Sequence, residues 1–99
     1  MATLSFTKNQ KTEQFEATFE ATGPFRVHIV SESFKNKIDL LVKTKGTNGY
    51  AWAMNNEEKR KHMNGNIFDE SFDPGVCPVS VMIVASQQPK EASYVIATN

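Results

Sequence analysis

In the segment 13–21, polar and apolar residues alternate without interruption from Gln14 onward, and this pattern limits the fold of the chain more than any other. The apolar members of this run, every second residue, are Phe15, Ala17, Phe19 and Ala21. A period of two matches the pleat of a β-strand, in which successive side chains point to opposite faces of a sheet. The segment therefore predicts an antiparallel strand with one face in a core and the other in solvent.

The same alternation recurs along most of the chain. It predicts further strands over residues 25–29, 37–43, 50–54 and 93–97, and the nearly continuous apolar run 76–85 predicts another. Leu4 and Phe6 suggest a first strand, and 67–72 is either a short strand or an irregular arm. Gly23 and Pro24 interrupt the pattern, so the strands on either side form a hairpin or a corner at which the chain changes sheets. In the 37–54 hairpin, Ile38, Leu40 and Val42 share one face, as do Tyr50, Trp52 and Met54 beyond the turn.

About seven or eight short strands, spaced roughly 8–12 residues apart, are typical of an all-β antiparallel sandwich. We expect a small β-sandwich of jelly-roll or immunoglobulin-like topology. Ninety-nine residues can bury one core, so the chain is predicted to be a single domain, 1–99, with an extended polar loop at 55–66. The lone Cys77 excludes an internal disulfide. The bulky predicted interior disfavours a barrel that encloses a ligand.

Residue types that carry chemistry are sparse. His28 and His62 are the two histidines that could serve as a catalytic base, and each is expected to be a plain surface residue. Cys77 lies among valines and is expected to be a small core residue. No phosphate-binding glycine loop, dinucleotide motif or zinc-ligand spacing occurs. We therefore expect no enzyme activity, no metal and no cofactor.

Two local clusters of charge are candidate binding sites. Acidic residues gather near a turn at Asp69, Glu70 and Asp73, but the segment lacks the spacing of a calcium loop, so the sequence leaves cation binding open. The only basic run, 59–62, directly follows two glutamates, and opposed charges of this kind usually pair with one another in solvent. Eleven basic and eleven acidic residues give no net charge, so neither nucleic acid nor a membrane is an expected partner.

The strongest functional signal is the segment 76–85, which is apolar on both faces of the predicted strand. Such a strand is either central in its sheet or covered by a partner. The first hypothesis is therefore a non-enzymatic structural or assembly module that binds other protein surfaces, copies of itself included. Auxiliary virion proteins of the capsid-decoration or head-fibre type are small domains of this class. The candidate contact residues are Lys59, Arg60, His62, Met82 and Val84.

The alternative hypothesis is a carbohydrate-binding or adhesive sandwich module. Its candidate stacking platforms are Tyr50, Trp52 and Tyr94. An aromatic ring that binds a sugar must be exposed in the free protein, whereas the pattern favours Trp52 as a core residue. The sequence begins with no secretory signal, so synthesis in the cytoplasm with a virion destination is expected, and an extracellular setting would require a signal that was removed.

Overall fold

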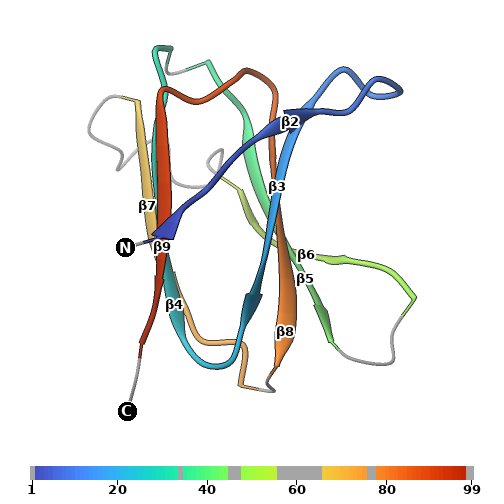
Figure 1. Ribbon diagram of the computed structural model, residues 1–99, viewed down its shortest axis with the longest axis vertical. Coiled ribbons are helices and arrows are strands. Elements are labelled where there is room, and N and C mark those ends of the chain that lie inside the picture. Colours follow the sequence, from blue (N-terminus) through green and yellow to red (C-terminus); the bar gives the residue numbers. More distant parts are fainter. Residues whose placement is uncertain (1, 34, 45–47, 56–65, 76–77, 98–99) are drawn as a thin grey trace.

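The computed structural model describes residues 2–33, 35–44, 48–55, 66–75 and 78–97, and for 52–55 the backbone alone. These residues form nine strands and no helix (Figure 1). The strands are β1 (Ala2–Thr3), β2 (Thr7–Lys8), β3 (Phe15–Ala21), β4 (Phe25–Val30), β5 (Ile38–Thr44), β6 (Ala51–Asn55), β7 (Ile67–Phe72), β8 (Val79–Ala85) and β9 (Glu91–Ile96). No helix in this part of the chain could therefore cross a membrane.

The strands form two antiparallel sheets that pack as the layers of a sandwich (Figure 1). One sheet has the order β1-β9-β4-β7, and the other has the order β2-β3-β8-β5-β6. The chain changes sheets between β1 and β2, between β3 and β4, between β4 and β5, and at each step from β6 to β9. This is the strand order of a jelly roll, in which two Greek keys are wound together. The expected β-sandwich is confirmed, and the turn at Gly23 and Pro24 is a sheet-changing corner.

The core lies between the inner faces of the two sheets. Its fully or almost fully buried apolar residues are Leu4, Ala17, Phe19, Ala21, Phe25, Val27, Ile29, Ile38, Leu40, Phe68, Val79, Val81, Ile83 and Ala85. Aromatic contacts join the sheets. The Phe19 ring meets the Phe25 ring edge to face, with 5.3 Å between the ring centroids, and stacks on the Tyr94 ring, with 4.0 Å between the centroids. Burying a side chain of this size contributes about 1.5–3 kcal/mol. The alternation that predicted β3 therefore also identifies its buried face.

The N-terminal segment differs from the single strand that Leu4 and Phe6 suggested. Two short strands replace it: β1 pairs with β9 in one sheet, β2 pairs with β3 in the other, and Leu4 and Phe6 lie between them. The chain crosses from one layer to the other here, which prevents a continuous ladder (Figure 1). We call residues 2–8 the crossing segment.

A β-bulge separates residues that the sequence pattern placed on one face. Leu40 pairs with Met54, but the next residue, Leu41, pairs with Trp52, so Ala53 is the extra residue on β6. Leu40 is buried in the core, whereas Leu41 lies on the outer side of the sheet and is partly exposed. Met54 is thus paired with Leu40, which faces the core, and Trp52 is paired with Leu41, which faces outward. The side chain of Trp52 lies outside the described structure.

A buried polar residue, Asn36, fastens the connections at one end of the sandwich. Its amide nitrogen donates to Ser31 Oγ and to the Gln87 carbonyl, both at 2.9 Å. Its amide oxygen accepts from the Gln87 N–H at 2.8 Å and from Ser86 Oγ at 3.2 Å. Ser31 follows β4, and Ser86 and Gln87 follow β8, so this one side chain joins two connections between the sheets. Both polar atoms of the amide have hydrogen-bond partners, so burying the side chain leaves no polar atom unsatisfied.

Replacing Asn36 by alanine should destabilise the fold, because this one side chain joins two connections between the sheets. Asn36→Ala leaves the buried Ser31 hydroxyl and the part-buried groups of Ser86 and Gln87 without the amide, so we expect a loss of about 2–4 kcal/mol in the free energy of unfolding. Urea unfolding followed by circular dichroism measures it. Asn48→Ala, at an exposed position, is the matched control and should cost less than about 0.5 kcal/mol. Equal losses in the two variants would contradict this account.

Candidate functional site

The outer surface of the five-stranded sheet carries an apolar centre on its middle strand. Along β8, inward residues are fully buried, whereas the outward residues Met82 and Val84 remain partly exposed. Leu41 of β5 is directly opposite Met82 in the antiparallel ladder, and it too is partly exposed. We call Leu41, Met82 and Val84 the docking face. It belongs to two adjacent strands, so its position is fixed by their register.

Among the side chains that the structure describes, polar and charged residues of β3 and β5 border the docking face. On β3, Glu16 is opposite Val84, Thr18 is opposite Met82, and Glu20 accepts a 2.5 Å hydrogen bond from Ser80. On β5, Asp39 is opposite Val84, and Lys43 lies with its amino nitrogen 5.9 Å from the centroid of the Tyr50 ring. An apolar centre with a polar rim is the common anatomy of a protein–protein contact.

The outer surface of the other sheet carries an ionic cluster centred on Asp69 of β7. Arg26 of β4 donates from Nε and from a terminal nitrogen to the two oxygens of Asp69, each at 2.7 Å. His28 Nδ1 lies 3.0 Å from Asp69 Oδ2. The hydrogen bond from Arg26, more than any other contact, lowers the pKa of Asp69 to about 2, and the same bond raises the pKa of Arg26. The cluster ties β4 to β7.

A row of three residues across this sheet, Ser93, His28 and Asp69, has the residue types of a hydrolase triad. The geometry does not support that chemistry. Arg26 binds both oxygens of the carboxylate, and no hydrogen bond joins Ser93 to His28 in the described part of the chain. His28, expected to be a plain surface residue, is instead a member of the ionic cluster. The sequence pattern did not indicate this contact because its partner Asp69 is distant in sequence.

The remaining acidic residues near the turn do not converge on one point. Asp69 and Glu70 follow one another along β7 and so alternate between its faces, and Asp73 accepts from the Gly75 N–H at 2.9 Å within its own turn. No group of three potential metal ligands occurs among the described residues.

The structure brings together only some of the residues that the sequence singled out for binding. Met82 and Val84 share one surface with Leu41, which the pattern had assigned to the polar side of its strand. Lys59, Arg60, His62, Cys77 and nearly all of the predicted 55–66 loop lie outside the described residues. The extra signal for the docking face was available in the sequence: Leu41 is the one apolar residue among the polar positions of 37–43.

Two of the three aromatic residues of the sugar-binding hypothesis have described side chains, and these two, Tyr50 and Tyr94, do not share one site. Tyr50 precedes β6 and lies near Lys43, in the five-stranded sheet. Tyr94 belongs to β9 of the opposite sheet, where it faces inward and stacks on Phe19. No protein-family model matches the chain, and comparison with curated proteins and with solved structures found no significant match. The functional proposal therefore depends on the residues themselves.

The ionic cluster predicts a specific pH dependence of stability. Because the pKa of Asp69 is lowered from its ordinary value of 3.8 to about 2, the ionised carboxylate stabilises the fold above roughly pH 4. This contribution is lost as the pH falls through about 2. We expect Asp69→Asn to unfold at a lower urea concentration than the parent chain at about pH 7, with the difference shrinking toward about pH 2.

Urea unfolding of both chains at several pH values measures this effect. Glu91→Gln, on an exposed strand position of the same sheet, provides the control and should leave stability almost unchanged across the range. A difference between Asp69→Asn and the parent that stays constant down to about pH 2 would show that the charge of Asp69 is not the cause.

Proposed function

We propose that this chain is a non-enzymatic assembly module that packs its docking face against another protein surface, with a second copy of the chain as the first partner to test. The observation that carries the proposal is the partly exposed apolar centre formed by Leu41, Met82 and Val84. These residues lie over a sheet whose inner face already has a complete core. Apolar area left at the centre of an outer surface gains free energy when a partner covers it.

The position of the docking face favours contact between sheet faces over strand addition. β8 is hydrogen-bonded to β3 on one side and to β5 on the other, so its backbone offers no free edge. A partner must therefore approach the outer surface and pack side chain against side chain, as stacked sheets do at a spacing of about 10 Å.

The charges around the docking face are compatible with self-association. With a two-fold axis along β8, Glu20 of one copy would face Lys43 of the other, while Glu16 would face Asp39. One attractive and one repulsive pair nearly cancel, so the apolar centre supplies the net attraction. The absence of net charge on the chain also means that no long-range repulsion opposes the approach of two copies.

A finer form of the proposal is an auxiliary virion component of the capsid-decoration or head-fibre type. The jelly-roll topology is compatible with it, since viral capsid domains use this architecture. Lectin domains use the same architecture, so topology alone does not separate the virion role from glycan binding. The virion role is therefore supported by analogy with other small β-sandwich proteins, whereas the assembly role is supported by the docking face of this chain.

Light scattering across a concentration series of the full chain tests the assembly role. We expect the mass to rise from the monomer to a defined oligomer, with Met82→Lys shifting the transition at least tenfold higher in concentration. A buried, unpaired lysine at the centre of an apolar contact costs more than the roughly 1.4 kcal/mol that corresponds to a tenfold change.

Val95→Lys is the matched control for this experiment, because it adds the same charge at an exposed apolar position on the outer face of the other sheet. It should leave the transition unchanged. A chain that stays monomeric at every concentration would overturn self-association. An oligomer that is equally sensitive to both substitutions, or to neither, would show that the docking face is not the contact surface.

A further inference from the structure

The edge strands of the two sheets differ in length and regularity. β1 and β2 are two residues long, and β6 contains the bulge at Ala53. β7 has six residues, keeps an unbroken register with β4 and contains neither proline nor glycine. Short length, bulges and prolines are features that commonly keep a sheet edge from pairing with another chain. Of the edge strands that the structure describes, β7 is therefore the one with the length and regularity to receive a further strand.

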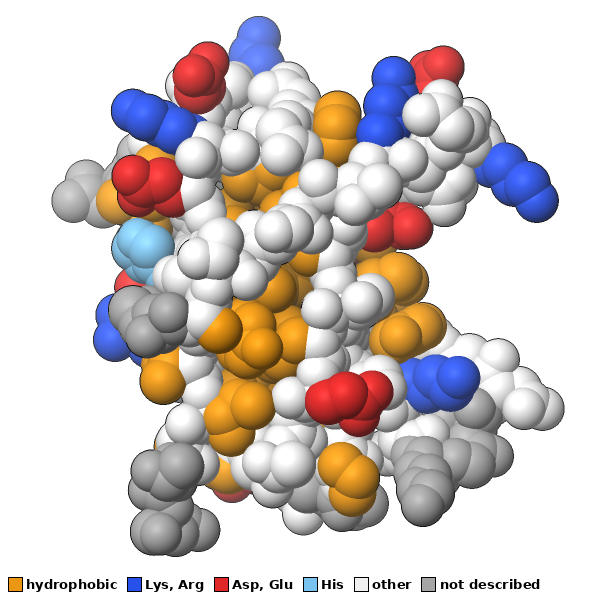
Figure 2. Space-filling model, in the orientation of Figure 1, with side chains coloured by type: hydrophobic (Ala, Val, Ile, Leu, Met, Phe, Trp, Pro, Cys, Tyr) orange, Lys and Arg blue, Asp and Glu red, His pale blue; other side chains and the backbone are white. Residues whose placement is uncertain are grey.

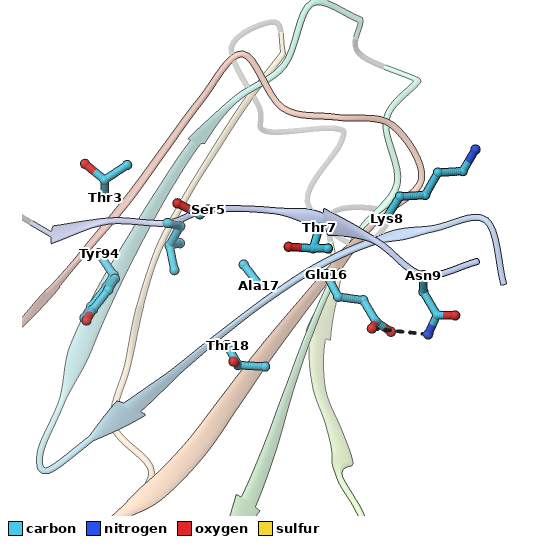
Figure 3. A pocket seen from close by; sticks show the side chains of 10 residues that line it. Thr3, Ser5, Thr7, Lys8, Asn9, Glu16, Ala17, Thr18 and Tyr94 are labelled. Atoms are coloured by element: carbon cyan, nitrogen blue, oxygen red, sulfur yellow. Dashed lines mark hydrogen bonds between the residues drawn. The ribbon is translucent and has the colours of Figure 1, made fainter. Parts of the chain in front are cut away.

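The edges on the other side of the sandwich carry the crossing segment. It passes in front of β3, and just beyond it Asn9 donates a hydrogen bond to Glu16 of β3 (Figure 3). Between β1 and β2, the Leu4 N–H donates to the Ala92 carbonyl at 2.9 Å. The chain itself thus bridges the two sheets on this side, and an added strand is expected at β7 instead.

The register of β7 shows which of its backbone groups point away from the sheet. The Ser31 N–H donates to the Asn66 carbonyl at 3.0 Å, so these two residues form a hydrogen-bonded pair at the start of the antiparallel ladder. Such pairs recur at every second residue, and the even-numbered residues of β7 therefore bond to β4. The backbone N–H and C=O groups that point to the open side belong to Ile67, Asp69 and Ser71.

These outward backbone groups are accessible to a partner. Ile67 is 37% exposed, and Ser71 is exposed as well. Within the described ranges, β4 is the only strand paired with β7, and no backbone hydrogen bond reaches the open side of Ile67, Asp69 or Ser71. A row of alternating donors and acceptors of this kind is the template on which an extended peptide adds to a sheet.

The side chains of β7 disfavour pairing with the same strand of a second copy. In an antiparallel pair related by a two-fold axis, the residue on the axis lies opposite its own counterpart. The two registers with the greatest overlap place the axis at Asp69 or at Glu70. Each sets a carboxylate directly opposite an identical carboxylate, and like charges in this position destabilise a strand pair. The occupant of this edge is therefore expected to be a different sequence.

The inward side of β7 specifies the side chains of that sequence. Phe68, Glu70 and Phe72 lie on this side, and toward the open edge they occupy non-hydrogen-bonded positions, where facing side chains come closest. Apolar residues opposite the two rings extend the core, because Phe72 is only partly buried. A lysine or arginine opposite Glu70 is favoured by its opposite charge.

The charge of the surrounding surface favours the same partner. In β7 and the turn after it, the described acidic residues are Asp69, Glu70 and Asp73, and neither segment contains a basic residue. Arg26 of β4 binds both oxygens of Asp69 and offsets that one carboxylate. At the left of Figure 2, over this sheet, acidic and basic side chains lie around a histidine. Three carboxylates beside one arginine leave the edge with an excess of negative charge.

We propose that β7 accepts an extended segment of another protein as an added antiparallel strand. That segment carries a basic residue opposite Glu70 and apolar residues opposite Phe68 and Phe72. The site is separate from the docking face, which belongs to β5 and β8 of the other sheet. Self-association through the docking face and strand addition at β7 can therefore fail independently.

The test is an NMR titration of the isotopically labelled full chain with a blocked seven-residue peptide, Thr-Val-Thr-Lys-Thr-Val-Thr. We expect saturable shifts of the amide signals of Ile67, Asp69 and Ser71. The matched peptide with glutamate in place of the central lysine should bind about fivefold more weakly, and Glu70→Lys should reverse this preference. Shifts that do not saturate, or that bypass β7, would show that the edge takes no strand.

Ser71→Pro and Ser71→Ala form a matched pair of variants. The proline removes an N–H that points to the open side and keeps the bonds to β4, so it should raise the dissociation constant of the lysine peptide about fivefold. The alanine keeps that N–H and should bind as the parent chain does. Equal binding by the two variants would overturn strand addition, and equal affinity for the two peptides would overturn the assignment of a basic partner.

Discussion

The packing of β8 between β3 and β5 is the constraint on which the rest of this structure depends. Its inward residues, from Val79 to Ala85, are fully buried and occupy the middle of the core. A slip of one residue in its register would exchange the two faces and expose that core. The same register that buries Ile83 therefore fixes Met82 and Val84 on the outer surface, so the fold and the docking face have one cause.

Polar contacts hold the ends and edges of the sandwich around this centre. Asn36 joins the connection after β4 to the connection after β8, so both sheet changes at that end share one buried side chain. The ionic cluster of Arg26, His28 and Asp69 fastens the edge strand β7 to β4. At the opposite edge the crossing segment spans both sheets, pairing with β9 in one and with β3 in the other.

The sequence predicted the parts of the fold that a period of two can specify. β3, β4, β5 and β9 follow from local alternation, because half-buried strands record their own orientation in every second residue. β8 follows instead from a nearly continuous apolar run, which predicts a central or covered strand. Other features depend on distant partners and left no local signal. The bulge at Ala53 and the split N-terminal strand arise from pairing, and the contact between His28 and Asp69 joins residues 41 positions apart.

Oxidative footprinting of Met82 measures whether the outer face of β8 is covered in the assembled state. The chain is exposed briefly to peroxide at concentrations below and above its association, and Met82 oxidation is measured by mass spectrometry. The account predicts ready oxidation in the dilute chain, where Met82 is partly exposed, and strong protection in the concentrated chain. Equal oxidation of Met82 in an oligomer and in the monomer would contradict it.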